Sequence, residues 1–333
     1  MPNILEPTVA MTQLLRDSGS KDQRQSEAAT RQLAVALTTP LRKGVFSGYV
    51  LDGIFERYVL EPGAAPEYPL DFVQPGTEKN YVAYTIPSQG RIPEHDVSGD
   101  YVMVPTFSIG NSIDWLLKYA RDARWDIVSR AMQALEAGFI KKTNDDGWHV
   151  ILAAGADRNI MVYDSAASAG QFTKRVVSLG KTVMRRNGGG NSTSVNRGKL
   201  TDLWISPEGI EDIRDWGVDQ IDEVTRKQIF DAADGTLNRI FGVNLHDLDE
   251  LGVGQEYQNF FTGELEGSLQ ASDLELMVGL DLRTSDSFVN PVREEVEVFD
   301  DPTLHRQQRA GVYAWGEHGF ACLDNRRVVL LSF

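Results

Sequence analysis

The chain has 333 residues, a net charge of −15 at pH 7, 41% hydrophobic residues and one cysteine, Cys322. This length and composition exclude a chain that is disordered throughout and predict a folded protein of about two domains. The lone cysteine permits no internal disulfide and fits a reducing cytosol. No run of eighteen apolar residues and no basic-then-apolar leader occurs, which argues against a spanning helix and against secretion.

The first 43 residues are mostly polar and charged. Weak helical patterns lie at 8–15 and 26–37, but they hold too few apolar positions for an independent domain. We therefore predict an N-terminal arm over residues 1–43 that becomes ordered against neighbouring surfaces.

Residues 44–107 hold seven of the thirteen prolines. Proline interrupts helices and central strands, so this segment cannot form a compact sheet. Aromatic and β-branched residues gather in short strand-like runs, which lie at 45–51, 54–60, 81–86 and 101–104. We predict a long projecting β hairpin, the extended loop. An isolated hairpin is marginally stable in water, so its apolar residues need another surface, and the nearest candidate is a second copy of the chain.

A long amphipathic helix is predicted next, within residues 108–148. It begins at Asn111 or Ser112 and continues to Lys142, with apolar residues at helical spacing and no proline. At roughly 1.5 Å per residue the helix is about 45 Å long. The alternative is a helix broken near Gly138.

The rest of the chain alternates between predicted helices and strands, which gives an α+β protein. The clearest local signal is Ser206-Pro207-Glu208, a cap followed by a first-turn proline and acid, which starts a helix over 207–216. Further helices are predicted at 167–186, 224–230 and 256–261. Strands are predicted at 149–154, 203–205, 295–299, 311–316, 320–323 and 327–333, with a glycine-rich loop at 187–192 and a turn at Asp324-Asn325.

Candidate binding loops do not match their motifs. Residues 188–199 are glycine-rich, but Leu200 stands where a phosphate loop has Ser or Thr, and Thr193 stands where the first glycine belongs. Residues 144–147 resemble part of a calcium loop, but Lys142 and Ala153 occupy ligand positions, so we predict a solvated turn.

Candidate catalytic residues are equally sparse. Ser206 lacks the glycines of a nucleophile elbow. The five histidines, His95, His149, His246, His305 and His318, show no metal-site spacing.

Three further groups have structural interpretations. Residues 246–250, the densest group of possible ligands, are interpreted as a half-buried loop. Cys322 is interpreted as a packed hydrophobe. The acidic residues Glu294, Glu295, Glu297, Asp300 and Asp301 are interpreted as a solvated strand face, with an arginine patch on a partner as the alternative. We assign no catalytic, cofactor-binding or metal-binding residues and expect no cofactor.

The order of these segments resembles the major capsid protein of tailed bacteriophages, whose fold was first described in the Hong Kong 97 phage. The resemblance extends over residues 40–333 and rests on packing motifs, which are 101–107 (YVMVPTF), 200–217 (LTDLWISPEGIEDIRDWG), 240–245 (IFGVNL) and 319–329 (GFACLDNRRVV).

The resemblance implies a structural protein, not an enzyme, that forms hexamers and pentamers. These close into an icosahedral shell around double-stranded DNA, which the shell encloses without sequence-specific binding. It also implies that 44–107 lies over a neighbouring subunit, that 108–148 forms the spine helix of a peripheral domain, that 149–285 forms most of an axial domain, and that 286–333 completes both.

Implied partners are a scaffolding protein, a portal and in some phages a decoration protein. Only about forty residues precede the loop, so we expect a separate scaffolding protein or a processed chain. The implied location is the virion, assembled in the host cytoplasm without a membrane. Some relatives cross-link a loop lysine to a neighbour's asparagine; Lys79 and Asn290 are candidates, and we do not assign the cross-link.

Two other functions stay open from sequence. An encapsulin-like nanocompartment shares the fold but encloses enzymes. A soluble α/β hydrolase would require a convergent polar pocket, for which the sequence offers no motif.

Overall fold

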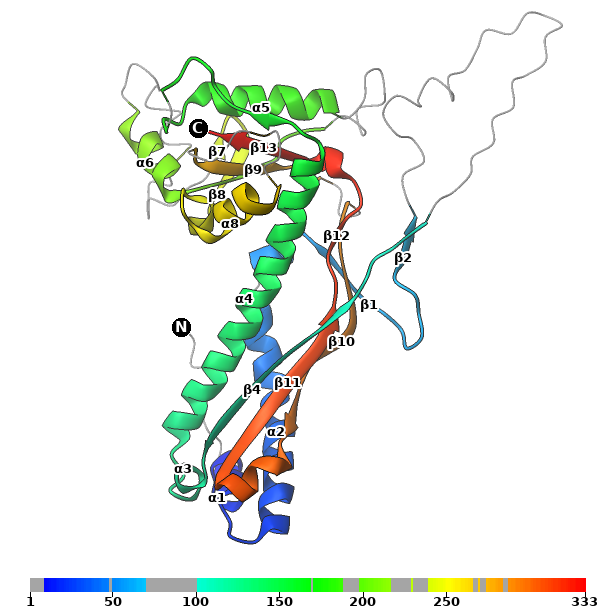
Figure 1. Ribbon diagram of the computed structural model, residues 1–333, viewed down its shortest axis with the longest axis vertical. Coiled ribbons are helices and arrows are strands. Elements are labelled where there is room, and N and C mark those ends of the chain that lie inside the picture. Colours follow the sequence, from blue (N-terminus) through cyan, green and yellow to red (C-terminus); the bar gives the residue numbers. More distant parts are fainter. Residues whose placement is uncertain are drawn as a thin grey trace, which may run out of the picture. The chain divides into compact units, whose positions relative to one another are not determined.

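The computed structural model describes residues 9–47, 50–69, 101–168, 170–187, 198–216, 239–265, 274–283 and 287–333, with the single residues 229 and 269. The chain divides into two compact units (Figure 1), each formed by three segments. Unit 1 comprises Met1–Glu67, Met103–Gly147 and Val289–Ala321, and unit 2 comprises Tyr68–Val102, Trp148–Phe288 and Cys322–Phe333.

Two N-terminal helices belong to unit 1, α1 (Val9–Ser18) and α2 (Gln23–Ser47). The helical patterns predicted at 8–15 and 26–37 are confirmed, but α2 is longer and continues through Pro40. It does so because Leu33, Leu37 and Leu41, at helical spacing, are buried in the core of the unit. The strand run predicted at 45–51 is therefore wrong, since it holds the end of α2 and a 3₁₀ turn, η1 (Val50–Gly53).

The sheet of unit 1 has the order β1-β10-β11-β4, with β12 (Ala321–Cys322) also paired to β10. Its long strands are β4 (Phe107–Leu116), β10 (Phe288–Asp300) and β11 (Arg309–His318), which pair antiparallel. The short β1 (Glu56–Val59) pairs parallel with β10. A 3₁₀ turn, η6 (Pro302–Gln307), connects β10 to β11. The strands predicted at 54–60, 295–299, 311–316 and 320–323 are confirmed, but β10 and β11 are longer than predicted and β1 and β12 are shorter.

The long helix begins later than predicted and also ends later. Residues 107–116 form β4 because they pair along their whole length with β11, so the helix start at Asn111 or Ser112 is wrong. A short helix, α3 (Leu117–Arg121), follows. The left-handed backbone of Ala123, at φ 51°, then separates it from α4 (Trp125–Asp157).

The 33 residues of α4 span about 50 Å at 1.5 Å per residue. The helix is not interrupted at Gly138. It also includes residues 149–154, so the strand predicted there is wrong, and residues 144–147, which are helical rather than a turn. The buried residues Trp148, Ile151 and Leu152 keep helical spacing, which extends the helix into the second unit.

Unit 2 contains a mixed sheet of six strands in the order β5-β13-β9-β6-β8-β7. The strands are β5 (Met161–Val162), β6 (Asp202–Ile205), β7 (Arg239–Ile240), β8 (Val243–Asp247), β9 (Leu276–Leu280) and β13 (Val328–Ser332). All residues of β9 and β13 are buried, which confirms the predicted C-terminal strand and places it inside the sheet.

Helices cover both faces of this sheet (Figure 1). On one face lie α5 (Lys174–Asn187) and α6 (Pro207–Asp215), which share a core with Leu203 and Leu331. On the other face lies α8 (Glu256–Phe260), followed by the single π turn η4 (Phe261–Leu265). The helices predicted at 207–216 and 256–261 are confirmed, while the one predicted at 167–186 begins only at Lys174.

A separate two-stranded sheet joins β2 (Glu67–Pro69) and β3 (Tyr101–Met103). Most of the extended loop, residues 70–100, lies outside the described residues, as do the loop at 188–190 and most of the helix predicted at 224–230. The extended loop therefore stays a prediction.

Candidate assembly surfaces

The two faces of the sheet in unit 1 carry different side chains. Along β11, Ala310, Val312 and Ala314 are buried against the helices, and the residues between them face the other way. This alternation places Tyr313 and Trp315 on an outer face. In the described part of unit 1, the helices therefore cover one side of the sheet.

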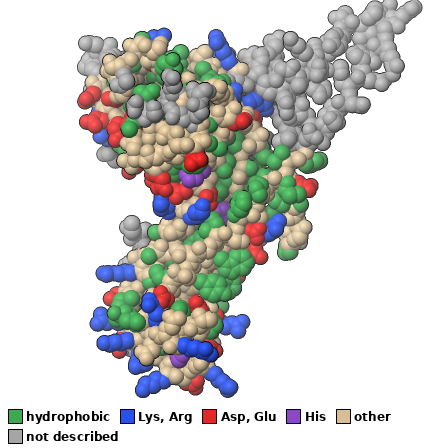
Figure 2. All heavy atoms as spheres, in the orientation of Figure 1, with side chains coloured by type: hydrophobic (Ala, Val, Ile, Leu, Met, Phe, Trp, Pro, Cys, Tyr) green, Lys and Arg blue, Asp and Glu red, His purple; other side chains and the backbone are tan. Residues whose placement is uncertain are grey.

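The outer face carries a stack of three aromatic rings. The ring centroid of Phe299 lies 5.4 Å from that of Tyr313 and 6.2 Å from that of Trp315, in stacked geometry. In the neighbouring strand β4, Ser112 and Gly110 stand opposite Tyr313 and Trp315, so no large side chain covers the rings from there. Figure 2 shows hydrophobic side chains gathered over this part of unit 1.

Exposed apolar residues continue along the edge of the same sheet. Phe107 is 65% exposed and Leu116 is 44% exposed, at the two ends of β4, which is an edge strand of the described sheet. A long edge strand with exposed apolar residues is a surface on which another chain can pair or pack. The arrangement suits protein association rather than chemistry.

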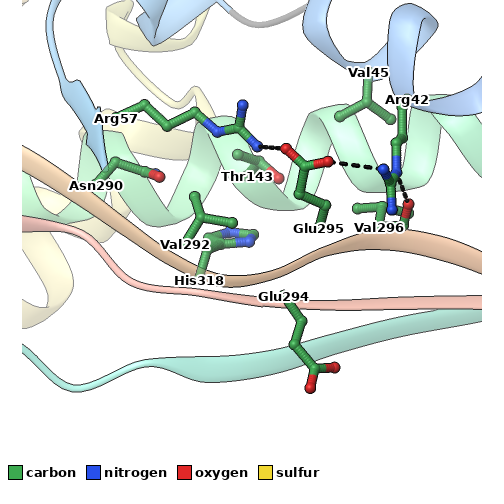
Figure 3. A pocket seen from close by; sticks show the side chains of 10 residues that line it. All are labelled: Arg42, Val45, Arg57, Thr143, Asn290, Val292, Glu294, Glu295, Val296 and His318. Carbon is green, nitrogen blue, oxygen red and sulfur yellow. Dashed lines mark hydrogen bonds and ion pairs between the residues drawn. The ribbon is translucent and has the colours of Figure 1, made fainter. Parts of the chain in front are cut away.

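A hollow of about 550 Å³, including its solvent-open part, lies elsewhere in unit 1 and holds an ion-pair network. The carboxylate of Glu295 lies between Arg42 and Arg57, at 2.8 Å from each guanidinium (Figure 3). Arg42 also pairs with Glu297 at 2.9 Å and donates to the Val296 carbonyl at 2.7 Å. Because Arg42 belongs to α2 and Arg57 to β1, the network ties both elements to β10.

This network corrects one interpretation of the sequence. Of the predicted solvated acidic face, Glu295 and Glu297 bind arginines of their own chain, not a partner's patch. Asp301 accepts a hydrogen bond from the Thr303 amide and caps the turn after β10. Glu294 is exposed and points away from the hollow in Figure 3.

The hollow also contains His318. Burial lowers the pKa of this imidazole, an effect that outweighs the attraction of Asp146, and the charges of Arg57 and Lys142 add to it. His318 is therefore neutral at pH 7. A lone neutral imidazole beside an occupied ion-pair network gives no basis for assigning catalysis.

Asn290, considered for a cross-link, is buried and also lines the hollow, opposite Arg57 in the pairing of β1 with β10. Its candidate partner Lys79 lies outside the described residues. The buried position of Asn290 gives no support to a cross-link at this residue.

Unit 2 has a buried charge cluster around Asp281, which is fully buried. Its carboxylate accepts hydrogen bonds from Arg283 and Arg327, each at 2.7 Å, and from the Lys199 amide at 2.8 Å. Burial would raise the pKa of Asp281, but these hydrogen bonds outweigh it and hold the pKa below its usual value. The backbone near Lys199, considered above as a phosphate loop, thus binds a carboxylate of the protein itself.

The densest group of potential ligands, 246–250, is a strand end and a 3₁₀ turn, η3 (Asp249–Leu251), instead of the predicted loop. His246 Nε2 lies 2.9 Å from Asp202 Oδ1, and its ring stacks on Trp204 at 4.6 Å. Asn244 donates to the same carboxylate at 2.8 Å. No group of three His, Cys, Asp or Glu suited to a metal ion occurs in the described part of the chain.

The remaining candidates have structural roles. Ser206 is fully buried and caps α6, accepting a hydrogen bond from the Gly209 amide at 3.5 Å. Burial raises the pKa of the Cys322 thiol to about 12, so the thiol stays protonated and is a poor nucleophile. None of the described helices is long and apolar enough to cross a bilayer.

Comparison with known proteins connects this architecture to viral shells. Neither the family models nor the curated proteins searched contain a match. A solved structure from Microbacterium phage Oxtober96 matches with a TM-score of 0.59 and 10% identity over 86% of this chain and 90% of that one. The capsid of Helicobacter pylori bacteriophage KHP30 matches with a TM-score of 0.55, 10% identity and the same coverage.

The chain has the Hong Kong 97 capsid fold. The predicted α+β class and the resemblance to phage capsid proteins are thus confirmed at the level of the fold. A virus-like particle from Pyrococcus furiosus also matches, with a TM-score of 0.50 and 11% identity over 89% of this chain and 97% of that one.

The outer face of unit 1, the Asp281 cluster and the Glu295 network differ in how far the sequence indicates them. The alternation of β11 indicates an uncovered face, although the aromatic stack depends on the pairing of β10 with β11. Arg327 lies 46 residues from its partner Asp281 along the chain, and no local pattern joins the two residues. The arginines that bind Glu295 come from helix and strand segments more than two hundred residues earlier.

Proposed function

We propose that this protein is the major capsid protein of a tailed bacteriophage, which self-assembles as hexamers and pentamers into an icosahedral shell around double-stranded DNA. The single observation that carries the proposal is the match of most of the chain to phage capsid structures in the Hong Kong 97 fold. The role is structural, and we assign the protein no enzymatic activity.

The outer face of unit 1 supports this function. An aromatic stack and an apolar edge strand expose surface that an isolated subunit leaves in water, and a neighbouring copy would bury it. Several interfaces of ordinary size, on the order of 1,600 Å² each, add to a stable container while each one stays reversible during assembly.

The domain roles follow from the fold family. We assign unit 1 to the peripheral domain, with α4 as the spine helix, and unit 2 to the axial domain near the capsomer centre. The part of residues 44–107 that follows β1, which pairs within its own unit, is proposed to lie over a neighbouring subunit, and residues 1–43, whose helices pack on the core of unit 1, to act as the N-terminal arm. Both assignments rest on the resemblance to capsid proteins.

The proposed partners are further copies of the chain, a scaffolding protein, a portal and, in some phages, a decoration protein. The shell encloses DNA without reading its sequence, in keeping with a net charge of −15. The proposed location is the virion, with assembly in the cytoplasm of the bacterial host.

An encapsulin-like shell is the second candidate, and the match to the Pyrococcus furiosus virus-like particle favours it. In that case the shell would enclose proteins in place of a genome. A soluble hydrolase is a remote third candidate, because the described hollow holds a satisfied ion-pair network.

Negative-stain electron microscopy of the purified protein, expressed alone and with its neighbouring genes, tests the proposal. We expect closed shells or capsomer rings. Nucleic acid and protein analysis of the purified particles then separates a genome container from an enzyme container. A persistent monomer under every condition would contradict both shell functions.

A further inference from the structure

Positive charge is concentrated in one segment of this acidic chain. Residues 165–201 contain seven Lys or Arg residues and no Asp or Glu, whereas the whole chain has a net charge of −15. Five of the seven belong to α5, and that helix has no acidic residue. A segment of this sign in a chain of the opposite sign indicates a surface with a specific partner.

The basic residues of α5 lie on its solvent side. Val176, Val177 and Met184 are buried against the sheet of unit 2. Arg185 and Arg186, in the last turn, are exposed, and among the described residues neither guanidinium group has a hydrogen-bond or ion-pair partner. Their positive charges also interact favourably with the negative C-terminal end of the helix dipole. That interaction leaves both guanidinium groups available to a second partner.

The basic residues nearer the start of α5 are already engaged. Arg175 lies 3.5 Å from the Asp164 carboxylate, and Lys181 donates to the Phe241 carbonyl at 2.7 Å. The available charge of α5 is therefore at its C-terminal end.

The opposite charge gathers at α6 of the same unit. Glu208, Glu211 and Asp215 are exposed, and the described part of the chain offers none of them an ion pair. Burial, together with the nearby carboxylates of Glu208 and Asp212, raises the pKa of Glu275. Several carboxylates are thus held close together at this end of the unit, and Arg214 of α6, whose charge opposes the rise that burial causes in the pKa of Asp247, compensates them only in part.

The two charged groups lie at opposite ends of unit 2. The start of α5 lies beside the end of α6, because Phe172 stacks on Trp216 at 5.5 Å and its amide donates to Asp212 at 2.6 Å. The helix then runs away from α6 over its 14 residues, about 20 Å at 1.5 Å per residue, to reach Arg186. Figure 1 shows that α5 runs away from α6, and Figure 2 shows acidic side chains near α6 and basic side chains near the far end of α5.

We propose that Arg185 and Arg186 at the end of α5 bind the exposed carboxylates of Glu208, Glu211 and Asp215 on α6 of the next copy in a capsomer. The inference rests on the proposed function and names one of its subunit contacts. A contact between opposite ends of identical units is heterologous, and such contacts close into rings when the rotation between copies is a fraction of a full turn.

A second copy fits these observations better than nucleic acid does. Nucleic acid would satisfy Arg185 and Arg186 but would leave the carboxylates of α6 unpaired, whereas a head-to-tail contact satisfies both ends. Complementary charges of this kind also set the orientation of partners and speed their encounter, and they are weakened by salt.

Charge-reversal variants test the contact in the full-length protein. Arg185→Glu with Arg186→Glu makes both ends acidic, and Glu211→Arg with Asp215→Arg makes both ends basic. We expect each pair to lower the yield of shells about tenfold or more, because like charges then meet across the contact. A chain with all four substitutions restores complementarity at every contact and is expected to assemble again.

The matched control is Arg185→Lys with Arg186→Lys, which keeps the charge and should assemble as the unmodified chain does. Circular dichroism and thermal melting establish that every variant is folded. Assembly of the Arg185→Glu, Arg186→Glu variant at the normal yield would overturn the proposal. So would failure of the folded four-substitution chain to assemble.

The nucleic acid content of the shells distinguishes binding of nucleic acid at Arg185 and Arg186 from a contact between copies. Shells of the Arg185→Glu, Arg186→Glu variant that form normally but retain less nucleic acid would assign the basic end to the genome and overturn the contact between copies. If the unmodified chain forms no shell or ring under any condition, the proposed function itself fails, which is a different result.

Discussion

Helices cover both faces of the sheet in unit 2, whereas in unit 1 they cover one face and leave aromatic side chains on the other. The strands differ accordingly. Every residue of β9 and β13 in unit 2 is buried, while most residues of β4 in unit 1 are exposed or half-buried. Unit 2 thus completes its own sheet, and unit 1 leaves surface for a neighbour.

The units also differ in where they place charge. Unit 2 buries Asp281 completely between two arginines, and unit 1 keeps its Arg42–Glu295 pair about one-third exposed. A buried pair is costly to break because the remaining partner stays uncompensated, whereas an exposed pair contributes little. The stability of unit 2 is therefore expected to depend more strongly on single charged residues.

Asp281→Ala gives the largest expected effect. It leaves Arg327, whose side chain is 12% exposed, with only the more distant Asp324 carboxylate at 3.6 Å, and should lower the free energy of unfolding by about 3–5 kcal/mol. Urea unfolding measures the change. Because the pKa of Asp281 is lowered in the folded state, its contribution is present above pH 3.8 and disappears as the pH falls below that value through the folded pKa. An equal loss in the matched variant Glu295→Ala of unit 1 would contradict the contrast between the units.

Leu37→Ala tests whether α2 is an integral covering layer of unit 1. Leu37 is fully buried, so its truncation should lower the free energy of unfolding by about 2–5 kcal/mol. Val35, on the same helix, is 69% exposed, and Val35→Ala is the matched control with little expected change. Thermal melting of both variants is the measurement. Equal and small shifts would mean that α2 contributes no packing to unit 1.

Ser206→Ala sharpens the comparison within unit 2. The substitution removes the cap of α6 and should cost about 1 kcal/mol, less than the loss of a buried ion pair. Ser206→Thr, which keeps the hydroxyl, is the control for the cap. A loss as large as that of Asp281→Ala would show that the cap, and not the charge cluster, limits the stability of this unit.

The lowered pKa of His318 predicts a smaller effect of pH on the stability of unit 1. Burial lowers its pKa in the folded state, so below about pH 6.5 the unfolded chain binds more protons and stability falls. The fall continues until the pH reaches the folded pKa. We expect His318→Gln to flatten the stability profile in this window, as measured by urea midpoints between pH 7.5 and 5. An unchanged profile would place the pH sensitivity elsewhere.

The fold was predictable where local signals and packing agree. Ser206-Pro207-Glu208 starts α6 by its own chemistry, and the C-terminal strand carries a continuous apolar run. In β4, by contrast, Ile113 and Leu116 fit a helical period, and the pairing with β11 overrides that pattern. A local period does not reveal pairing between distant segments, so the sequence predicts a helix that begins too early.

The assembly surfaces were less predictable than the fold. The sequence indicated a need for a neighbour through the extended loop, most of which lies outside the described residues. The aromatic stack of Phe299, Tyr313 and Trp315 requires the register of two strands, and no spacing along the chain reveals it. The basic segment 165–201 is the exception, because a count of charges along the sequence finds it.

Amide hydrogen exchange of the unassembled protein and of purified shells tests the contrast between the units most directly. The account predicts that β9 and β13 are strongly protected in both states, because they lie inside a complete sheet. It predicts that β4 gains protection on assembly, when a neighbouring copy covers its edge and the outer face. If β4 is already as protected in the unassembled protein as in the shell, unit 1 does not depend on a neighbour and the account is contradicted.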